Sequence, residues 1–127
     1  MRREFSFLIE GPLSGFLATY KRSWTKEAKH YVAQKARVRL LANVAGIPDL
    51  LMPDETARIS LELFWKKRAR IDSVNVYKFV EDGIFQKDRR VLHGEFKAYE
   101  FFQAEMAKVR IEIFDQAGYL ALKPLEL

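Results

Sequence analysis

The chain has 127 residues, the length of one domain (residues 1–127) that can bury a core of its own. Its 22 Lys and Arg exceed its 17 Asp and Glu by five charges, and this basic excess favours a polyanionic partner, although a basic protein without such a partner has the same composition. The absence of Cys excludes disulfides and thiolate metal sites. No apolar run has the length of a transmembrane helix and Ser6 and Glu10 interrupt the apolar start, so we expect a cytoplasmic protein without a signal peptide or membrane contact.

The first 24 residues predict a strand followed by a basic and aromatic loop. Apolar residues alternate with others from position 5 to position 9, and a Gly-Pro pair at 11 and 12 ends the strand. In the loop, Lys21 and Arg22 lie between Tyr20 and Trp24. Such a mixture suits a sugar-phosphate backbone with unpaired bases, whereas the same aromatic residues can also simply pack the loop onto the sheet.

A helix is predicted next. Ser23 or Thr25 can cap it, apolar residues keep a helical period from 28 to 45, and Gly46 with Pro48 stops it. Five Lys and Arg lie between positions 26 and 39. They form either a solvated helix face or, beside a nucleic-acid site, a surface that follows phosphates.

The clearest strand pattern runs from residue 57 to residue 66 and leads into a basic cluster. Apolar side chains occupy every second position, which is the period of a strand with one buried face. The cluster that follows consists of Lys66, Lys67, Arg68 and Arg70. These cations can pair with neighbouring carboxylates, or they can bind phosphates.

The central stretch predicts a second helix that carries polar residues on one face. Asp72 suits an N-cap, and Gly83 can supply the left-handed residue that ends the helix. Asn75, Lys78 and Asp82 recur at spacings of three and four residues, so they share a face with Asp72. The opposite stripe is apolar and predicts core or a dimer contact: Val76, Phe79, Val80, Ile84 and Phe85.

Asp88 joins this polar face only if the chain doubles back. A ten-residue helix climbs about 15 Å, and five extended residues after Gly83 recover roughly 17 Å, so Asp72 and Asp88 can meet at one end of the helix. Two carboxylates, the amide of Asn75 and the ammonium of Lys78 around one point suit Mg²⁺ or Mn²⁺ and a phosphate. Alternatively, Asp72 is only a helix cap and Asp88 only a turn residue.

The remaining residues predict two more strands. Arg89 and Arg90 follow Asp88, residues 91–102 form a strand with a possible bulge at Gly94, and residues 109–114 form the last strand. Residues 115–118 turn, and an apolar tail over 119–127 packs on the body or on a second subunit. The order of elements predicts an α+β domain with a mixed or antiparallel sheet and two main helices on one face.

The central stretch resembles the core of the RusA family of Holliday-junction resolvases. The family pattern is roughly Asp-x-Asp-Asn-x-x-Lys-x-x-x-Asp, then a Gly and a later Asp-Asp pair. The residues that match it, in order and nearly in spacing, are Asp72, Asn75, Lys78, Asp82 and Asp88. Val74 and Lys87 stand where the family has Asp, and the turn after Asp82 is shorter. The wider likeness covers about residues 5–114, with only the central stretch specific.

The resemblance implies a metal-dependent endonuclease that cleaves branched DNA in recombination and repair. It implies that Asp72 and Asp88 hold Mg²⁺ or Mn²⁺, that Lys78 is needed for cleavage, and that the protein acts as a homodimer. Asn75 would orient a water or cap the helix. The candidate nucleic-acid-binding residues are Lys21, Arg22, Lys66, Lys67, Arg68, Arg70, Arg89 and Arg90.

Two other functions remain open from the sequence. Because Val74 replaces a family carboxylate, the protein can be a weakened relative that binds structured DNA without cutting it. A metabolic enzyme unrelated to nucleic acids is a third possibility, against which the absence of a Gly-rich phosphate loop counts.

Overall fold

The computed structural model describes residues 2–11, 13, 26–66, 73–85 and 90–122, with the backbone alone at 26–31, 73–75 and 122. Along the chain the elements are β1 (Arg2–Glu10), α2 (Lys26–Val44), β2 (Thr56–Phe64), α3 (Ser73–Ile84), β3 (Val91–Tyr99), β4 (Met106–Phe114) and α4 (Gln116–Leu122). This order confirms the predicted sequence of strands and helices and adds one helix, α4, at its end.

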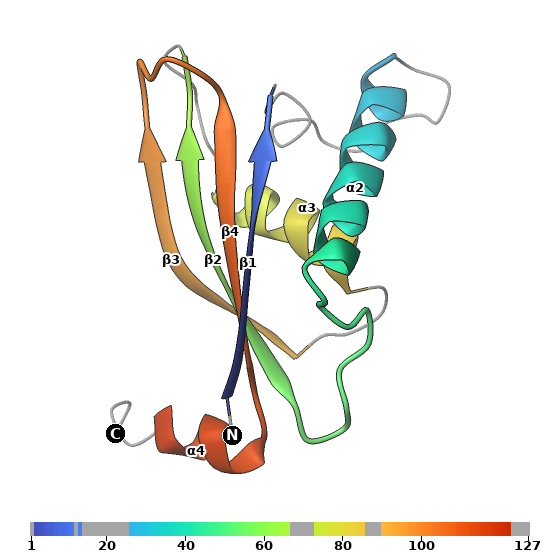
Figure 1. The fold of residues 1–127 in the computed structure, drawn as a ribbon, viewed down its shortest axis with the longest axis vertical. Helices are drawn as coiled ribbons and strands as arrows, with labels where there is room; N and C mark the ends of the chain where they lie inside the picture. Colours follow the sequence, from blue (N-terminus) through green and yellow to red (C-terminus); the bar gives the residue numbers. More distant parts are fainter. Residues whose placement is uncertain (1, 12, 14–25, 67–72, 86–89, 123–127) are drawn as a thin grey trace.

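The four strands form one mixed sheet in the order β1-β4-β2-β3. β4 pairs antiparallel with both β1 and β2, while β2 and β3 run parallel. α3 is the connection between the two parallel strands, which need a crossover of this kind. Figure 1 shows α2 and α3 on one face of the sheet and α4 at the end where β1 begins. The predicted α+β class, with its two main helices on one face, is therefore confirmed.

The core lies between the sheet and the two main helices. Every second residue of β2 is buried on the helix side, as the alternating pattern predicted. α3 covers these residues with the apolar stripe expected from its sequence, so that stripe is core: Val76, Phe79, Val80 and Ile84 are each at most 2% exposed. None of the helices within the described ranges is both long enough and apolar enough to cross a membrane.

The predicted stop of α2 at Gly46 is confirmed. Gly46 has a φ of 86°, the left-handed conformation that glycine adopts without strain. Its N–H donates to the carbonyl of Asn43, and the N–H of Ile47 donates to the carbonyl of Ala42. These two bonds satisfy carbonyls at the helix end that otherwise lack a partner.

The predicted role of Gly83 is wrong. α3 continues through Gly83 to Ile84, and the N–H of Phe85 still donates to the carbonyl of Glu81. Gly83 instead lies where α3 crosses α2: a Cβ at this position would be 2.9 Å from Cγ1 of Val38. Because glycine has no side chain, the two helices can approach closely. Packing, and not a turn of the chain, is what requires glycine here.

The predicted bulge near Gly94 is confirmed. Ile59 pairs with His93 but Leu61 pairs with Phe96, so β3 carries one extra residue there. The N–H of Glu95 donates to Oγ of Ser60 at 3.2 Å.

Two predicted boundaries after β3 are wrong. β3 ends at Tyr99 and not at residue 102, because the chain turns at Phe101, whose φ is 58°. The predicted turn at 115–118 is instead the start of α4, in which Oδ1 of Asp115 accepts from the N–H of Gly118 at 2.8 Å. Asp115 is therefore a helix cap. The sequence alone does not distinguish an Asp that caps a helix from an Asp that begins a turn.

Candidate functional site

Most of the predicted site falls on segments outside the described residues. Asp72 and Asp88 lie there, together with six of the predicted nucleic-acid-binding residues: Lys21, Arg22, Lys67, Arg68, Arg70 and Arg89. Asn75 is described by its backbone alone, in the first turn of α3. Lys78, Lys66 and Arg90 are described in full.

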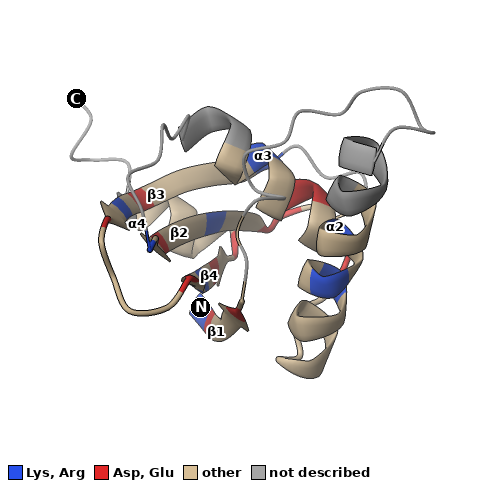
Figure 2. Ribbon diagram, turned by 90° about the horizontal axis from the view of Figure 1, so that it is seen from above, with Lys and Arg blue, Asp and Glu red and all other residues tan. Residues whose placement is uncertain are grey.

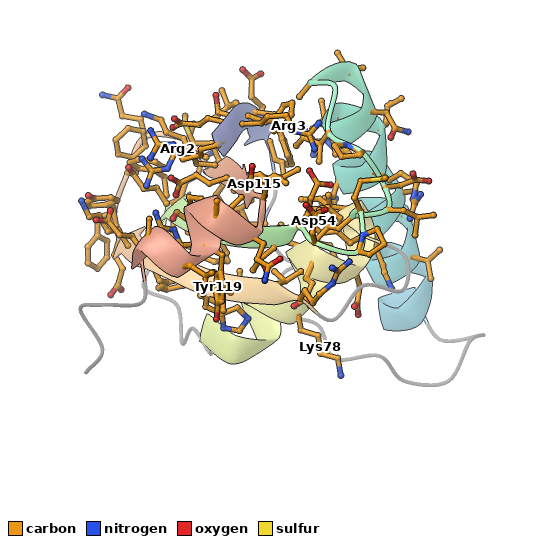
Figure 3. All side chains as sticks on the ribbon, turned by 90° about the horizontal axis from the view of Figure 1, so that it is seen from below. Arg2, Arg3, Asp54, Lys78, Asp115 and Tyr119 are labelled. Carbon is orange, nitrogen blue, oxygen red and sulfur yellow. The ribbon has the colours of Figure 1, made fainter. Side chains whose placement is uncertain are left out.

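α3 presents Lys78 to solvent. The residues on either side of it, Tyr77 and Phe79, are 4% and 1% exposed, whereas Lys78 itself is exposed. Figure 3 shows its side chain extending away from the body of the domain. α3 is described from Ser73 onward, and the predicted N-cap at Asp72 lies outside the described residues. Half-buried Asp82 lies one turn after Lys78 on the same helix.

α3 is longer than the helix predicted from the sequence, so fewer residues remain to bring Asp88 back towards Asp72. From Ser73 to Phe85 the helical backbone rises about 18 Å at 1.5 Å per residue. The three residues from Phe85 to Asp88 span at most about 10 Å when extended. The two side chains and an ion between them would have to cover the remainder. The meeting of these two carboxylates stays a prediction, and it requires a nearly straight return.

Tyr77, which sequence analysis missed, holds α3 against β3. Its hydroxyl lies 2.9 Å from the carbonyl oxygens of both Gly94 and Glu95, so its proton is donated at the bulge. Its ring stacks on His93 with centroids 4.0 Å apart and planes 4° apart. Burial, and next the negative charge of Glu95, raise the pKa of Tyr77 above its ordinary value. Because Tyr77 precedes Lys78 in the chain, this contact positions the helix turn that carries Lys78.

Arg90 and Lys66 have different surroundings. The guanidinium of Arg90 donates to the carbonyl oxygens of Pro53 and Leu51, so part of its donor capacity holds the loop before β2. Lys66 is exposed at the end of β2, where it lines an open cleft of about 500 Å³ with Glu10 and Glu105. Of these two, Lys66 is the more exposed, and the two carboxylates in its cleft outnumber its one positive charge.

The basic excess of the chain lies entirely outside the described residues. Those segments hold 8 of the 22 Lys and Arg and 3 of the 17 Asp and Glu, which leaves 14 of each sign in the described part. Figure 2 accordingly shows basic and acidic positions interspersed over the strands and helices. The excess positive charge that favours a polyanion therefore comes from the segments 14–25, 67–72 and 86–89.

The sheet face opposite the two main helices carries a second feature that sequence analysis missed. Glu112 is 3% exposed there, and its carboxylate accepts from Arg58 at 2.9 Å and from Arg2 at 3.2 Å, with Arg110 at 3.9 Å. The only sequence signal was strand alternation, which places Glu112 on a face that was expected to be solvated. The arginines provide the buried carboxylate of Glu112 with hydrogen-bond donors, and this stabilises the sheet.

A hollow of about 430 Å³ lies on the same face of the sheet, beside the small side chains of Ser6 and Ser60. Lys108 and Arg110 line it together with Glu62 and Glu95. The mixed charges give no excess of one sign for a phosphate, so we do not place the candidate site there.

No group of three or more His, Cys, Asp or Glu side chains that could hold a metal ion occurs within the described ranges. Carboxylates are the donors that Mg²⁺ prefers, and the sequence offers them at Asp72 and Asp88, in the segments that join β2 to α3 and α3 to β3. By donor chemistry these two residues fit such an ion. Neither the models of known protein families nor the curated proteins include a match to this chain.

Proposed function

We propose that this chain is a metal-dependent endonuclease that cleaves branched DNA, with a four-way junction as its substrate and a homodimer as its working form. The observation that carries the proposal is the exposed Lys78 on α3, six residues after Asp72 in the sequence. The spacing of Asp72, Asn75, Lys78 and Asp88 supports it, as does the concentration of the basic excess in the neighbouring segments.

The roles of the residues follow from their chemistry. The cations of residues 66–70 and 89–90 would bind DNA phosphates, which are contacts that position the backbone without reading its sequence. Lys78 would neutralise charge that develops on the scissile phosphate, and Asn75 would orient a water beside it. A divalent ion held by Asp72 and Asp88 would supply Lewis acidity and a more acidic water.

Two cuts are needed to resolve a four-way junction, and the junction has twofold symmetry. A homodimer with one site on each chain matches that symmetry.

The test is cleavage of an end-labelled synthetic four-way junction in Mg²⁺ or Mn²⁺. We expect paired, symmetric nicks by the unmodified protein. In Asp72→Asn and in Asp88→Asn we expect at least about a hundredfold slower nicking with an unchanged gel shift. Asp54→Asn, an exposed carboxylate before β2, is the matched control and should cut normally. Nicking at full rate in Asp72→Asn would remove that residue from the site.

A second candidate function is binding of structured DNA without cleavage, and Val74 is the residue that favours it. A valine cannot ligate a metal, so affinity for the ion would be low. The expected signature is a gel shift without nicks, together with nicking that appears when Val74→Asp supplies the carboxylate. The absence of both a shift and nicks would contradict both functions.

A further inference from the structure

β1 is an edge strand without structural protection among the described residues. The sheet order leaves β1 and β3 at the two edges. β1 pairs with β4 over all nine residues without a shift in register, and residues 5–9 contain no charge, Pro or Gly. Regular unpaired edges invite another strand, and proteins usually block them with a bulge or a charge. β3 has such a block in the bulge at Gly94, whereas β1 has no bulge and carries its charges only towards its two ends, at Arg2, Arg3, Glu4 and Glu10.

The sequence of β1 is complementary to itself in one antiparallel register. When two copies pair about a twofold axis at Ser6, Arg2 opposes Glu10 of the second copy and Phe5 opposes Phe7 of the second copy. All nine residues then have partners, the two outermost pairs join opposite charges, and between them Arg3 opposes Ile9 and Glu4 opposes Leu8 of the second copy.

The neighbouring registers are less favourable. A pairing centred on Phe7 sets Glu4 against Glu10 of the second copy, and a pairing centred on Phe5 sets Arg3 against Phe7 of the second copy; each pairs seven residues instead of nine. A slip by one residue would point the apolar side chains to the wrong face.

α2 supplies apolar surface beside this edge. It contacts β1 and lies at the β1 side of the helix layer in both views (Figures 1 and 2). Val32, Leu40 and Val44 on α2 are 56%, 62% and 78% exposed. A twofold axis through paired β1 strands keeps both helix layers on the same face of the joined sheet. The pairing therefore brings both α2 helices to the same face of the joined sheet, on either side of the axis.

We infer that a second copy of this chain pairs with β1, antiparallel and centred on Ser6, so that two four-stranded sheets join into one. The inference assigns a surface to the homodimer of the proposed function, and it rests on that function only for the expectation that two copies act together.

The test is the mass of the full chain in solution by light scattering over a dilution series at low salt. We expect the mass of two chains, and a dimer about tenfold weaker in Arg2→Glu and in Glu10→Arg, since each places like charges at both ends of the pairing. Mixing the two variants should restore the dimer, because every end pair then joins Glu with Arg. Lys97→Glu changes charge by the same amount at the other edge of the sheet and should leave the dimer intact.

Each other outcome overturns the inference. A monomer at all concentrations excludes the pairing. If both β1 variants form a dimer as strong as that of the unmodified protein, the interface lies elsewhere. Because Arg2 also bonds Glu112, the fold of each variant is checked by circular dichroism, and folded variants that fail to recover the dimer on mixing exclude the register centred on Ser6. Junction cleavage is scored separately, so an intact dimer that does not nick DNA contradicts the proposed function and leaves the pairing standing.

Discussion

Lys78 is the member of the predicted catalytic set whose surroundings are described in full. It is exposed on α3 between two buried neighbours, and among the described residues no ion pair involves its charge. We predict that Lys78→Met slows junction nicking by at least about a hundredfold and changes the free energy of unfolding by less than about 0.5 kcal/mol.

Lys97→Met, an exposed lysine on β3, is the control for Lys78→Met. It should leave both the nicking rate and the stability unchanged. Normal nicking by Lys78→Met would show that the cation on this face of α3 has no part in the chemistry.

Glu112 is a residue whose charge the fold does require. It is buried beside Arg58 and Arg2, and glutamine replaces one of its two acceptor oxygens with an NH2 group, which cannot accept from a guanidinium, and removes the negative charge. We predict that Glu112→Gln lowers the free energy of unfolding by about 2 kcal/mol, measured by urea denaturation.

Glu4→Gln provides the comparison on the same sheet face. Glu4 is half exposed, and its nearest cations are 3.9 and 4.0 Å away, so we expect a loss below about 0.5 kcal/mol. Equal losses in the two variants would contradict the special role of Glu112.

At the scale of elements, Tyr77 fastens α3 to the bulge of β3. We predict that Tyr77→Phe costs about 1 kcal/mol near neutral pH, because the hydroxyl donates to carbonyl oxygens in a buried contact. Its raised pKa means that the folded chain holds the phenol proton more tightly than the unfolded chain, whose Tyr has a pKa near 10.0. The stabilising effect is therefore complete below pH 10 and is lost as the pH rises through the raised pKa.

The measurement for Tyr77 is the urea midpoint from neutral pH to about pH 11. The difference between the unmodified protein and Tyr77→Phe should shrink at the alkaline end. Tyr99→Phe, at an exposed position on β3, should show no such narrowing. A constant difference across the range would contradict the pKa argument.

Gly83 sets the distance between α2 and α3. Alanine favours a helix by about 1 kcal/mol over glycine, but its Cβ would be 2.9 Å from Val38. We predict that overpacking prevails and Gly83→Ala destabilises the protein by about 1 kcal/mol net.

A second substitution separates the two effects at Gly83. In a Val38→Gly background both close contacts are gone, the one with Cγ1 at 2.9 Å and the one with Cβ at 3.0 Å, so Gly83→Ala should become neutral or stabilising by thermal denaturation. Destabilisation of similar size in both backgrounds would exclude the packing explanation.

The elements show which parts of the fold local patterns predict. Alternation and helical period identified β2, α2 and the buried stripe of α3, since those signals depend on neighbouring residues. They failed at Gly83, whose environment is a contact with Val38, 45 positions earlier in the chain. They also failed at α4, because an Asp that caps a helix and an Asp that starts a turn have the same local sequence.

At the scale of the whole molecule, the described part of the chain is neutral, and the basic excess lies in the segments on either side of α3 and in the segment before α2. The sequence predicted the residue types of a phosphate site and the helix face that carries Lys78. It did not determine whether Asp72 and Asp88 meet, because their separation depends on where α3 ends and on how straight the three residues after Phe85 run.

The central claim is that one divalent ion lies between Asp72 and Asp88, and binding of Mn²⁺ followed by electron paramagnetic resonance tests it without DNA. The account predicts one Mn²⁺ bound per chain in the unmodified protein. It predicts affinity at least about tenfold weaker in Asp72→Asn and in Asp88→Asn, and unchanged in Asp82→Asn. Equal binding of Mn²⁺ by the unmodified protein, Asp72→Asn and Asp88→Asn would contradict it.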